Sequence, residues 1–470
     1  MKLVSTRGDN RALSYVDVLL EGLAPDGGLF VPEEFPKITL GELEQLKAGT
    51  YQDVAFAVKK LLVAGALPES VLRNLIDDAY LPPAFSILPG QVVPVRKIAE
   101  GMWLQNLSLG PTAAFKDMAL QLLGREMDYV LKQKGTTLTI LGATSGDTGS
   151  AAEASLKGRN STTTFMLSPK IGMSAFQRAQ MGALSGGNIH NISIEGRFDD
   201  CQDLVKAVKQ DPQFRNLGAV NSINWGRITA QVPYYFSGYL QVVSRVGDEV
   251  DFVVPSGNFG NVYSGYVAKQ MGLPIRNLVI ATNENDVLHQ LLRTGVYEQK
   301  EAQITSSPSM DISKASNYER LAFDLLSRDG ARLSKYMQEF SSTGKVSFAD
   351  HGVSADRLSK LGFQSGSSSH KERLETIKAV YAETKSVIDP HTADGVTVAR
   401  ARGSQEVPVI CLESALAVKF EDTIKEALGF VPPRPARFVD LESQVGENAF
   451  VTLPSDIKQL TDYLRAHQTT

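Results

Sequence analysis

Lys116 is the residue whose type and position most strongly suggest chemistry. It follows the turn Gly110-Pro111, and apolar residues at helical spacing over residues 115–134 predict a long helix with Lys116 in its first turn. The N-terminus of a helix is the positive end of its dipole and disfavours a cation. A neutral amine, or one joined covalently as an imine, avoids this penalty, so the position suits a lysine that forms a Schiff base. The competing interpretation is an ordinary surface lysine.

Two glycine-rich turns support the first interpretation. Residues 142–149 follow an apolar strand at 137–141, and residues 256–261 follow another at 251–254; each turn opens a helix. Such turns expose backbone N–H groups and present a helix N-terminus to an anion. A lysine and two anion cradles in one chain indicate a ligand with a phosphate and a substrate with a carboxylate. Pyridoxal phosphate acting on an amino acid accounts for all three features, because it supplies a phosphate, a substrate carboxylate and an aldehyde that the lysine amine can attack.

Composition excludes several other classes of protein. The chain has 470 residues, enough for two or three domains, and its 43% hydrophobic and 21% charged residues are typical of globular proteins. A net charge of −4 gives no support for a nucleic-acid partner. The two cysteines, Cys201 and Cys411, lie far apart, which excludes a disulfide framework and fits a cytoplasmic protein. We expect no metal site, signal peptide or membrane span.

The expected organisation has three parts. Residues 1–88 predict a mostly helical N-terminal domain. Residues 89–430 alternate strands with helices and form the expected catalytic core, in which the small subdomain spans roughly residues 118–225. Residues 431–470 are expected to form a tail packed on the core, with a helix at 455–467. We expect strands at 102–107, 137–141, 162–167, 189–194, 252–254, 278–281 and 407–411. Alternation of this kind predicts two parallel-rich, helix-flanked sheets. Because ligands bind at the carboxyl ends of such strands, Lys116 and both glycine turns are expected to share one cleft.

Three local predictions concern loops and caps. Residues 365–369, a serine- and glycine-rich stretch, are interpreted as a loop. Ser369 and Glu372 have the spacing of a capping box at the start of a helix, and so do Ser316 and Glu319.

Taken in order, the motifs resemble those of threonine synthase, a pyridoxal-phosphate enzyme of fold type II, in its longer bacterial and fungal form. The resemblance covers nearly the whole chain and rests on an ordered set of segments: residues 5–8, 22–32, 110–117, 142–149, 221–225, 256–261, 309–312 and 389–393. It implies an α/β fold like that of the tryptophan synthase β subunit, with pyridoxal 5'-phosphate as cofactor.

The resemblance also implies a role for individual residues. Lys116 would hold the cofactor as a Schiff base, and Thr392 would hydrogen-bond the pyridine nitrogen as a neutral partner. The cofactor phosphate would rest on Gly257, Asn258, Phe259, Gly260 and Asn261, although the family often has Asp where Asn261 stands. The substrate α-carboxylate would lie against Ser145, Gly146, Asp147 and Thr148. Asn224 and Arg227 would contact the substrate phosphate, since the planar fork of arginine suits that group; Lys170 could assist, but its surroundings depart from the family pattern.

The implied activity is that of a lyase that converts O-phospho-L-homoserine and water into L-threonine and phosphate, with Lys116 as general base. One alternative is an elimination that releases 2-oxobutyrate and ammonia from the same substrate. Another is a non-catalytic protein on the same scaffold, which would have no need of Lys116. The expected partner is a small-molecule substrate, and the expected state is a monomer or a homodimer.

Overall fold

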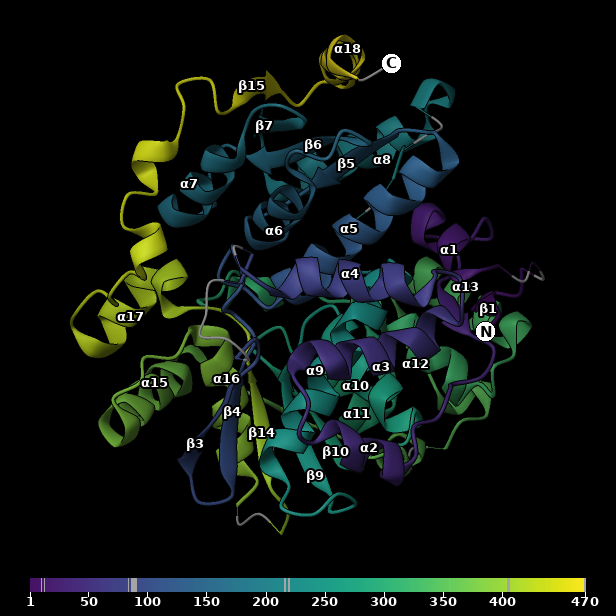
Figure 1. The fold of residues 1–470 in the computed structure, drawn as a ribbon, viewed down its shortest axis with the longest axis vertical. Coiled ribbons are helices and arrows are strands. Elements are labelled where there is room, and N and C mark those ends of the chain that lie inside the picture. Colours follow the sequence, from purple (N-terminus) through teal and green to yellow (C-terminus); the bar gives the residue numbers. More distant parts are fainter. Residues whose placement is uncertain are drawn as a thin grey trace.

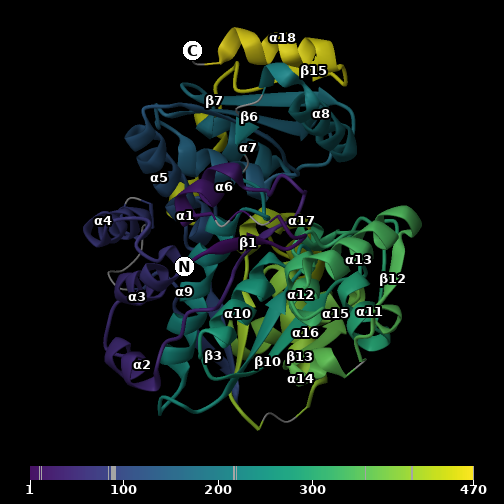
Figure 2. The ribbon, with the colours of Figure 1, turned by 90° about the vertical axis from the view of Figure 1, so that its right-hand side faces the viewer.

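Two sheets form the framework of the computed structural model, which describes residues 1–468 except 10, 12, 83, 86–90, 215, 216, 219, 355, 404 and 405. Figures 1 and 2 show the smaller sheet above the larger one. The larger sheet has the order β13 (Phe363–Ser367), β10 (Ile275–Thr282), β9 (Val250–Pro255), β14 (Val409–Glu413), β4 (Met102–Asn106) and β3 (Val95–Ala99). Its strands are parallel except β3, which pairs antiparallel with β4. The predicted α/β fold with parallel-rich sheets is confirmed.

The smaller sheet is parallel throughout. Its order is β15 (Val451–Pro454), β7 (Ile189–Glu195), β6 (Thr162–Pro169), β5 (Leu138–Ala143) and β8 (Leu217–Gly218). Two short antiparallel ribbons complete the strands: β1 (Leu3–Ser5) with β2 (Phe30–Pro32), and β11 (Val296–Glu298) with β12 (Lys345–Ser347). All seven predicted strands are present, within a few residues of the expected bounds.

Helices cover both sheets and fill the space between them. The N-terminal segment contributes α1 (Tyr15–Glu21), α2 (Leu40–Leu46), α3 (Tyr51–Val63) and α4 (Glu69–Tyr80). Two long helices, α5 (Lys116–Lys134) and α9 (Trp225–Val242), pack against each other, with α4 on α5 and α3 on α9. In Figure 1, α4 and α5 lie between the two sheets, whereas α3 and α9 lie lower, beside the elements of the larger sheet. The remaining helices of the smaller sheet are α6 (Asp147–Leu156), α7 (Ala175–Leu184), α8 (Phe198–Gln210) and α18 (Ile457–His467).

The larger sheet carries the other helices, which are α10 (Gly260–Gln270), α11 (Val287–Thr294), α12 (Tyr318–Leu325), α13 (Gly330–Thr343), α14 (Arg357–Lys360), α15 (His370–Thr384), α16 (Pro390–Ala401) and α17 (Glu421–Leu428). Local chemistry explains several helix ends. Ser369 accepts from the Glu372 N–H and Glu372 from the Ser369 N–H, so the capping box predicted for α15 is confirmed. Gly135 ends α5 in the left-handed conformation (φ 62°). Among the described residues, no helix combines the length and the apolar character needed to span a membrane.

Two local predictions were wrong. Residues 365–367 are not a loop but the end of β13, where the parallel backbone pairing with β10 compensates for a sequence of low strand propensity. Ser316 and Glu319 do not form a capping box: α12 begins after Asn317 without a side-chain cap, because the Glu319 carboxylate is bound instead by Thr6 and Arg7. The C-terminal tail also does more than pack on the core, since β15 extends the smaller sheet as an edge strand beside β7.

Candidate active site

The segments that follow three adjacent strands of the larger sheet lie together at the carboxyl ends of those strands. The segment after β4 leads to Lys116, the segment after β9 is the turn at residues 256–261, and the segment after β14 runs to a short 3₁₀ helix (Ala417–Phe420). Because these strands are parallel, their carboxyl ends lie side by side. The turn after β5 in the smaller sheet faces the same place, as the contacts of Lys116 show.

Lys116 is the first residue of α5, as predicted, and its side chain is 11% exposed. Its Nζ lies 3.2 Å from Asp147 Oδ2 and 3.4 Å from Ser309 Oγ. Burial lowers the pKa of the Lys116 amine below its ordinary value; the nearby Asp147 carboxylate opposes this, and the charges of Lys419 and Arg227 add to it. The site therefore favours a neutral amine at this position.

The turn at residues 144–148 presents both a backbone cradle and a carboxylate. Gly146 has φ 133°, which side chains rarely permit, and a Cβ there would meet Gln177 at 2.5 Å. The N–H groups of Asp147 and Thr148 belong to the first turn of α6, where a helix offers them no internal acceptor. They can hold an anion such as a substrate carboxylate.

The Asp147 side chain is itself fully engaged. Its Oδ1 accepts from Gln177 Nε2 at 2.9 Å and lies 2.8 Å from Lys419 Nζ, while its Oδ2 contacts Lys116 and accepts from Ser309 Oγ at 3.1 Å. Burial opposes ionisation, but Lys116 and Lys419 together hold the pKa of this carboxyl well below its usual range. Only the backbone of Asp147, and not its carboxylate, suits the predicted contact with a substrate carboxylate.

The second glycine turn touches the Lys116 neighbourhood through the segment around Ser309. A Cβ on Gly257 would lie 3.0 Å from Met310 Cα, so the turn requires glycine at its closest approach to that segment. Phe259 adopts the left-handed conformation (φ 65°) directly before α10, which directs N–H groups of the turn and of the helix N-terminus to one side. This arrangement fits a phosphate.

The carboxamide oxygen of Asn261 is bound within the protein. Its Oδ1 accepts from the hydroxyls of Tyr234 (2.6 Å) and Tyr235 (2.8 Å). Its Nδ2 is buried and has no hydrogen-bond partner among the described residues. Buried N–H groups are rarely left unpaired, so Nδ2 is the part of Asn261 that can serve an anion bound at this turn.

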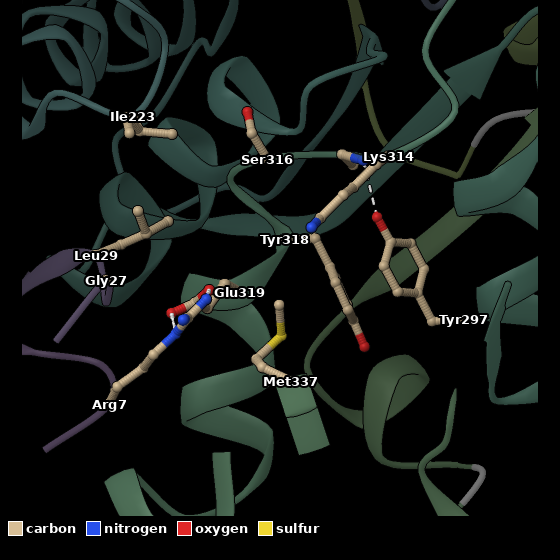
Figure 3. Close-up of a pocket in the computed structure, with 11 residues that line it drawn as sticks. Arg7, Gly27, Leu29, Ile223, Tyr297, Lys314, Ser316, Tyr318, Glu319 and Met337 are labelled. Carbon is tan, nitrogen blue, oxygen red and sulfur yellow. Dashed lines mark hydrogen bonds and ion pairs between the residues drawn. The ribbon is translucent and has the colours of Figure 1, made fainter. Parts of the chain in front are cut away.

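The turn is also braced from the N-terminal motif. Asn258 accepts at its carbonyl from the Asn317 backbone N–H (3.1 Å) and at Oδ1 from Ser316 Oγ (3.3 Å). Ser316 lines a cavity of about 190 Å³ together with Arg7 and Glu319, whose ion pair of 2.7 Å is drawn in Figure 3. The motif at residues 5–8 thus contacts the segment that supports the phosphate turn.

Thr392 lies in the first turn of α16 and is completely buried. Its hydroxyl donates to the Asp389 carboxylate and accepts from the Ser414 N–H at 3.2 Å. The neighbouring His391 has both ring nitrogens engaged: Nδ1 contacts Asp389 at 2.8 Å and Nε2 accepts from the Ser309 N–H at 3.0 Å. Through Ser309, the N-terminus of α16 adjoins Lys116.

Arg227 and Asn224, the two predicted phosphate contacts, differ in their surroundings. Arg227 is 4% exposed and donates from Nη1 to the Val220 carbonyl at 3.0 Å. Its Nε has no hydrogen-bond partner, and no carboxylate pairs with the guanidinium within the described part of the chain. Burial lowers its pKa to about 10. A buried, unpaired guanidinium is costly unless an anion binds it.

Asn224 has its side chain committed elsewhere. It is fully buried, its Oδ1 caps α9 by accepting from the Gly226 N–H at 2.8 Å, and its Nδ2 donates to the Leu19 carbonyl at 3.0 Å. A contact with a substrate phosphate would require it to give up one of these bonds. Lys170 is exposed and pairs with Glu195 at 2.9 Å, so the structure gives it no place among these groups.

Models of three protein families match the chain in order. The threonine synthase N terminus matches residues 2–80, the pyridoxal-phosphate dependent enzymes match residues 87–356, and the threonine synthase C-terminal family matches residues 392–464. A threonine synthase of Methylobacillus glycogenes is 47% identical over 99% of this chain and all of its own length. The chain belongs to the threonine synthase family.

Solved structures agree with this assignment. A pyridoxal-phosphate-bound threonine synthase from Brucella melitensis matches with a TM-score of 0.94 at 41% identity, each chain being covered in full. A yeast threonine synthase matches with a TM-score of 0.91 at 34% identity, over 99% of this chain and 98% of its own. Fold type II and the cofactor pyridoxal phosphate, both predicted from the sequence, are confirmed.

Three residues of this threonine synthase site were missed from the sequence. Lys419 and Gln177 bind Asp147, and Ser309 contacts both Asp147 and Lys116. Ser309 stands in a segment that carries the family resemblance, and Lys419 follows a predicted strand by eight residues. Their positions in the sequence could have drawn attention to these two residues, but they do not indicate that either residue contacts Asp147.

Proposed function

We propose that this chain converts O-phospho-L-homoserine and water into L-threonine and phosphate, as the name of its relatives implies. The observation that carries the proposal is Arg227, a buried guanidinium without a carboxylate partner in the described residues, whose charge reaches Lys116. A substrate that brings its own phosphate supplies the missing anion.

The residues divide the substrate between them. The N–H groups of Asp147 and Thr148 hold the α-carboxylate at the N-terminus of α6, since the Gly146 N–H already donates to Thr144, and Arg227 binds the phosphate at the other end of the substrate. Pyridoxal phosphate, when bound, supplies an electron sink for negative charge at the substrate Cα. Residues 257–261 would hold the cofactor phosphate, and Thr392 would be the partner of the ring nitrogen. Because the Thr392 hydroxyl already donates to Asp389, it would offer that nitrogen an acceptor rather than a proton.

Lys116 is the proposed base. Burial favours the neutral form of its free amine, which would take the proton from the substrate Cα. A second proton leaves Cβ and phosphate leaves Cγ; one proton then returns to Cγ, the hydroxyl of water adds at Cβ while its remaining proton goes to the released phosphate, and one proton returns to Cα. Lys116 is the amine anchored within reach of these atoms, and Ser309 Oγ at 3.4 Å holds it in place between transfers.

The decisive experiment measures phosphate and threonine together after mixing purified enzyme with O-phospho-L-homoserine. Lys116→Ala should abolish both products and the ability of borohydride to fix the cofactor to the chain. Lys132→Ala, which removes an exposed lysine of the same helix, should change neither. Threonine production by the Lys116 variant would refute the role of Lys116. Release of 2-oxobutyrate and ammonia in place of threonine by the unmodified enzyme would refute the proposed reaction.

We further propose that the enzyme works in the cytoplasm as a monomer or homodimer. Both cysteines, Cys201 and Cys411, are buried free thiols, which suits a reducing compartment. Light scattering of the purified chain determines the oligomeric state, and cell fractionation determines the location.

A further inference from the structure

Lys419 is a completely buried lysine beside the proposed base. It lies in the 3₁₀ helix after β14, and its side chain is 0% exposed. Its Nζ lies 2.8 Å from Asp147 Oδ1 and donates to the Thr112 carbonyl at 2.8 Å. Lysines are almost never buried in full unless a partner compensates the charge. Here the partner is the same carboxylate that contacts Lys116.

We propose that Lys419 is a positioning residue that holds Asp147 as its own counterion and thereby leaves Lys116 as the neutral amine of the site. The inference rests on the proposed role of Lys116, and it adds a second lysine with the opposite task. Lys419 stays charged and fixed, whereas Lys116 gains and loses protons.

The charge count of the cluster supports this division. With Lys419 protonated, Asp147 ionised and Lys116 neutral, the three groups sum to zero, the least costly state in a buried site. Protonating Lys116 would leave a net positive charge there, beside the unpaired guanidinium of Arg227. Without Lys419, the carboxylate of Asp147 would have Lys116 as its remaining cation at hydrogen-bond distance and would favour its protonated form.

Geometry assigns the charged state to Lys419 rather than to Lys116. Lys419 lies nearer to Asp147, at 2.8 Å against 3.2 Å, and has a second acceptor in the Thr112 carbonyl. Within the described part of the chain, the further hydrogen-bond acceptor of Lys116 is Ser309 Oγ, at the longer distance of 3.4 Å. An ammonium group has three N–H donors, so the position with more and shorter acceptor contacts stabilises it better.

The other groups around Lys116 do not change the balance. Asp147 faces it from α6, Lys419 from the segment after β14, and Arg227 from α9; these charged groups have the largest effects on its pKa. Asp117, next to Lys116 on α5, turns its carboxylate to the N–H and hydroxyl of Thr112. The His391 ring lies behind Ser309 and accepts from its backbone N–H.

A purely structural role for Lys419 would act through the Thr112 carbonyl alone. It would affect folding and the position of the turn before α5, but it would not move the titration of Lys116. The test therefore measures that titration in the cofactor-free protein, where neither cofactor binding nor turnover enters. Its failure would leave the proposed reaction untouched, since that is tested by the products.

Trace acetic anhydride labels neutral amines, and mass spectrometry of the Lys116 and Lys132 peptides as a function of pH gives the titration midpoint of each lysine. In the unmodified protein, Lys116 should titrate below the exposed Lys132. Lys419→Met should raise the Lys116 midpoint by about one pH unit or more, which is a roughly tenfold smaller neutral fraction at pH 7. Lys419→Arg keeps the charge and should restore a low midpoint.

The double variant Lys419→Met with Asp147→Asn removes both charges and should return the midpoint to the original value or below. It also avoids an unpaired buried carboxylate, so it tests the proposal even if the single variant does not fold. An unchanged Lys116 midpoint in Lys419→Met, or a high midpoint retained in the double variant, would overturn the proposal. So would a midpoint in the unmodified protein equal to that of Lys132.

Discussion

A buried ion pair joins the N-terminal helices to the two helices that carry the site. Lys59 on α3 and Glu126 on α5 are both 0% exposed, and Lys59 Nζ lies 2.8 Å from Glu126 Oε1. Lys59 also donates to Tyr15 (2.8 Å) and to Thr229 on α9 (3.0 Å), and Tyr15 donates to Glu126 at 2.7 Å. The pair thus connects the N-terminal segment to α5, which begins at Lys116, and to α9.

Removing one partner should be far more harmful than removing both. Lys59→Met leaves the Glu126 carboxylate buried without its cation, for which the expected loss is about 3–5 kcal/mol of unfolding free energy. Lys59→Met combined with Glu126→Leu leaves no buried charge, and such replacements are often close to neutral. The Tyr15 hydroxyl then loses its acceptor, which costs roughly 1–3 kcal/mol. We therefore expect the double variant to be about 2 kcal/mol more stable than Lys59→Met.

Urea unfolding, followed by the fluorescence of the buried Trp225 on α9, measures these differences. Lys60→Met is the matched control: Lys60 is the next residue on the same helix, but its ion pair with Glu69 is about half exposed and should be worth less than about 1 kcal/mol. If the effects of Lys59→Met and Glu126→Leu simply add in the double variant, the two groups are not coupled and the reasoning is refuted. A loss of no more than the Lys60 value would refute it equally.

Three further perturbations test other parts of the structure. Glu153 is fully buried, and burial raises the pKa of its carboxyl well above the ordinary value, although the nearby Asn191 opposes the shift. Stability should therefore fall as pH rises above about 4.5, and Glu153→Gln should remove roughly 1–3 kcal/mol of that loss at pH 8 in urea unfolding. Arg227→Lys should lower kcat/KM for phosphohomoserine roughly 10- to 100-fold, because lysine cannot replace the planar fork. Gly146→Ala should raise KM for phosphohomoserine, measured by phosphate release, because its Cβ would displace Gln177 at the turn proposed to hold the substrate carboxylate.

Each of these has a control on the same chain. Glu195→Gln changes an exposed carboxylate and should leave the pH dependence of stability unaltered. Arg178→Lys alters an arginine on α7 that packs over Phe450 and should leave kcat/KM unaltered. Gly158→Ala imposes similar backbone strain (φ +76°) in open space, so it separates strain from the collision at Gly146. Equal effects in a variant and its control would contradict the corresponding prediction.

The strands that the sequence predicts and those it misses differ in one physical respect. The seven predicted strands, β4 to β7, β9, β10 and β14, are all interior to their sheets, while the four missed strands of these two sheets, β3, β8, β13 and β15, are all edges. An interior strand of a helix-flanked sheet is covered on both faces and reads as an apolar run, as β9 does with six buried residues. An edge strand such as β15 has no buried residue and is held by backbone pairing, which leaves no pattern in its side chains.

The same distinction explains which parts of the site were predictable. At Lys116 and the two glycine turns, the backbone conformation restricts the residue type, because these positions lie at a helix N-terminus or have a positive φ. Such restrictions can be recognised in a single sequence. Lys419 and Gln177 act through their side chains on Asp147, across long sequence separations, and a buried lysine has the same letter as an exposed one. Asn224 and Asn261 show the converse, because the family motifs identify their positions but not that their side-chain oxygens are bound within the protein. What one sequence cannot supply is therefore the pairing of charges inside the cleft, and it is this pairing that determines which of two buried lysines is left neutral.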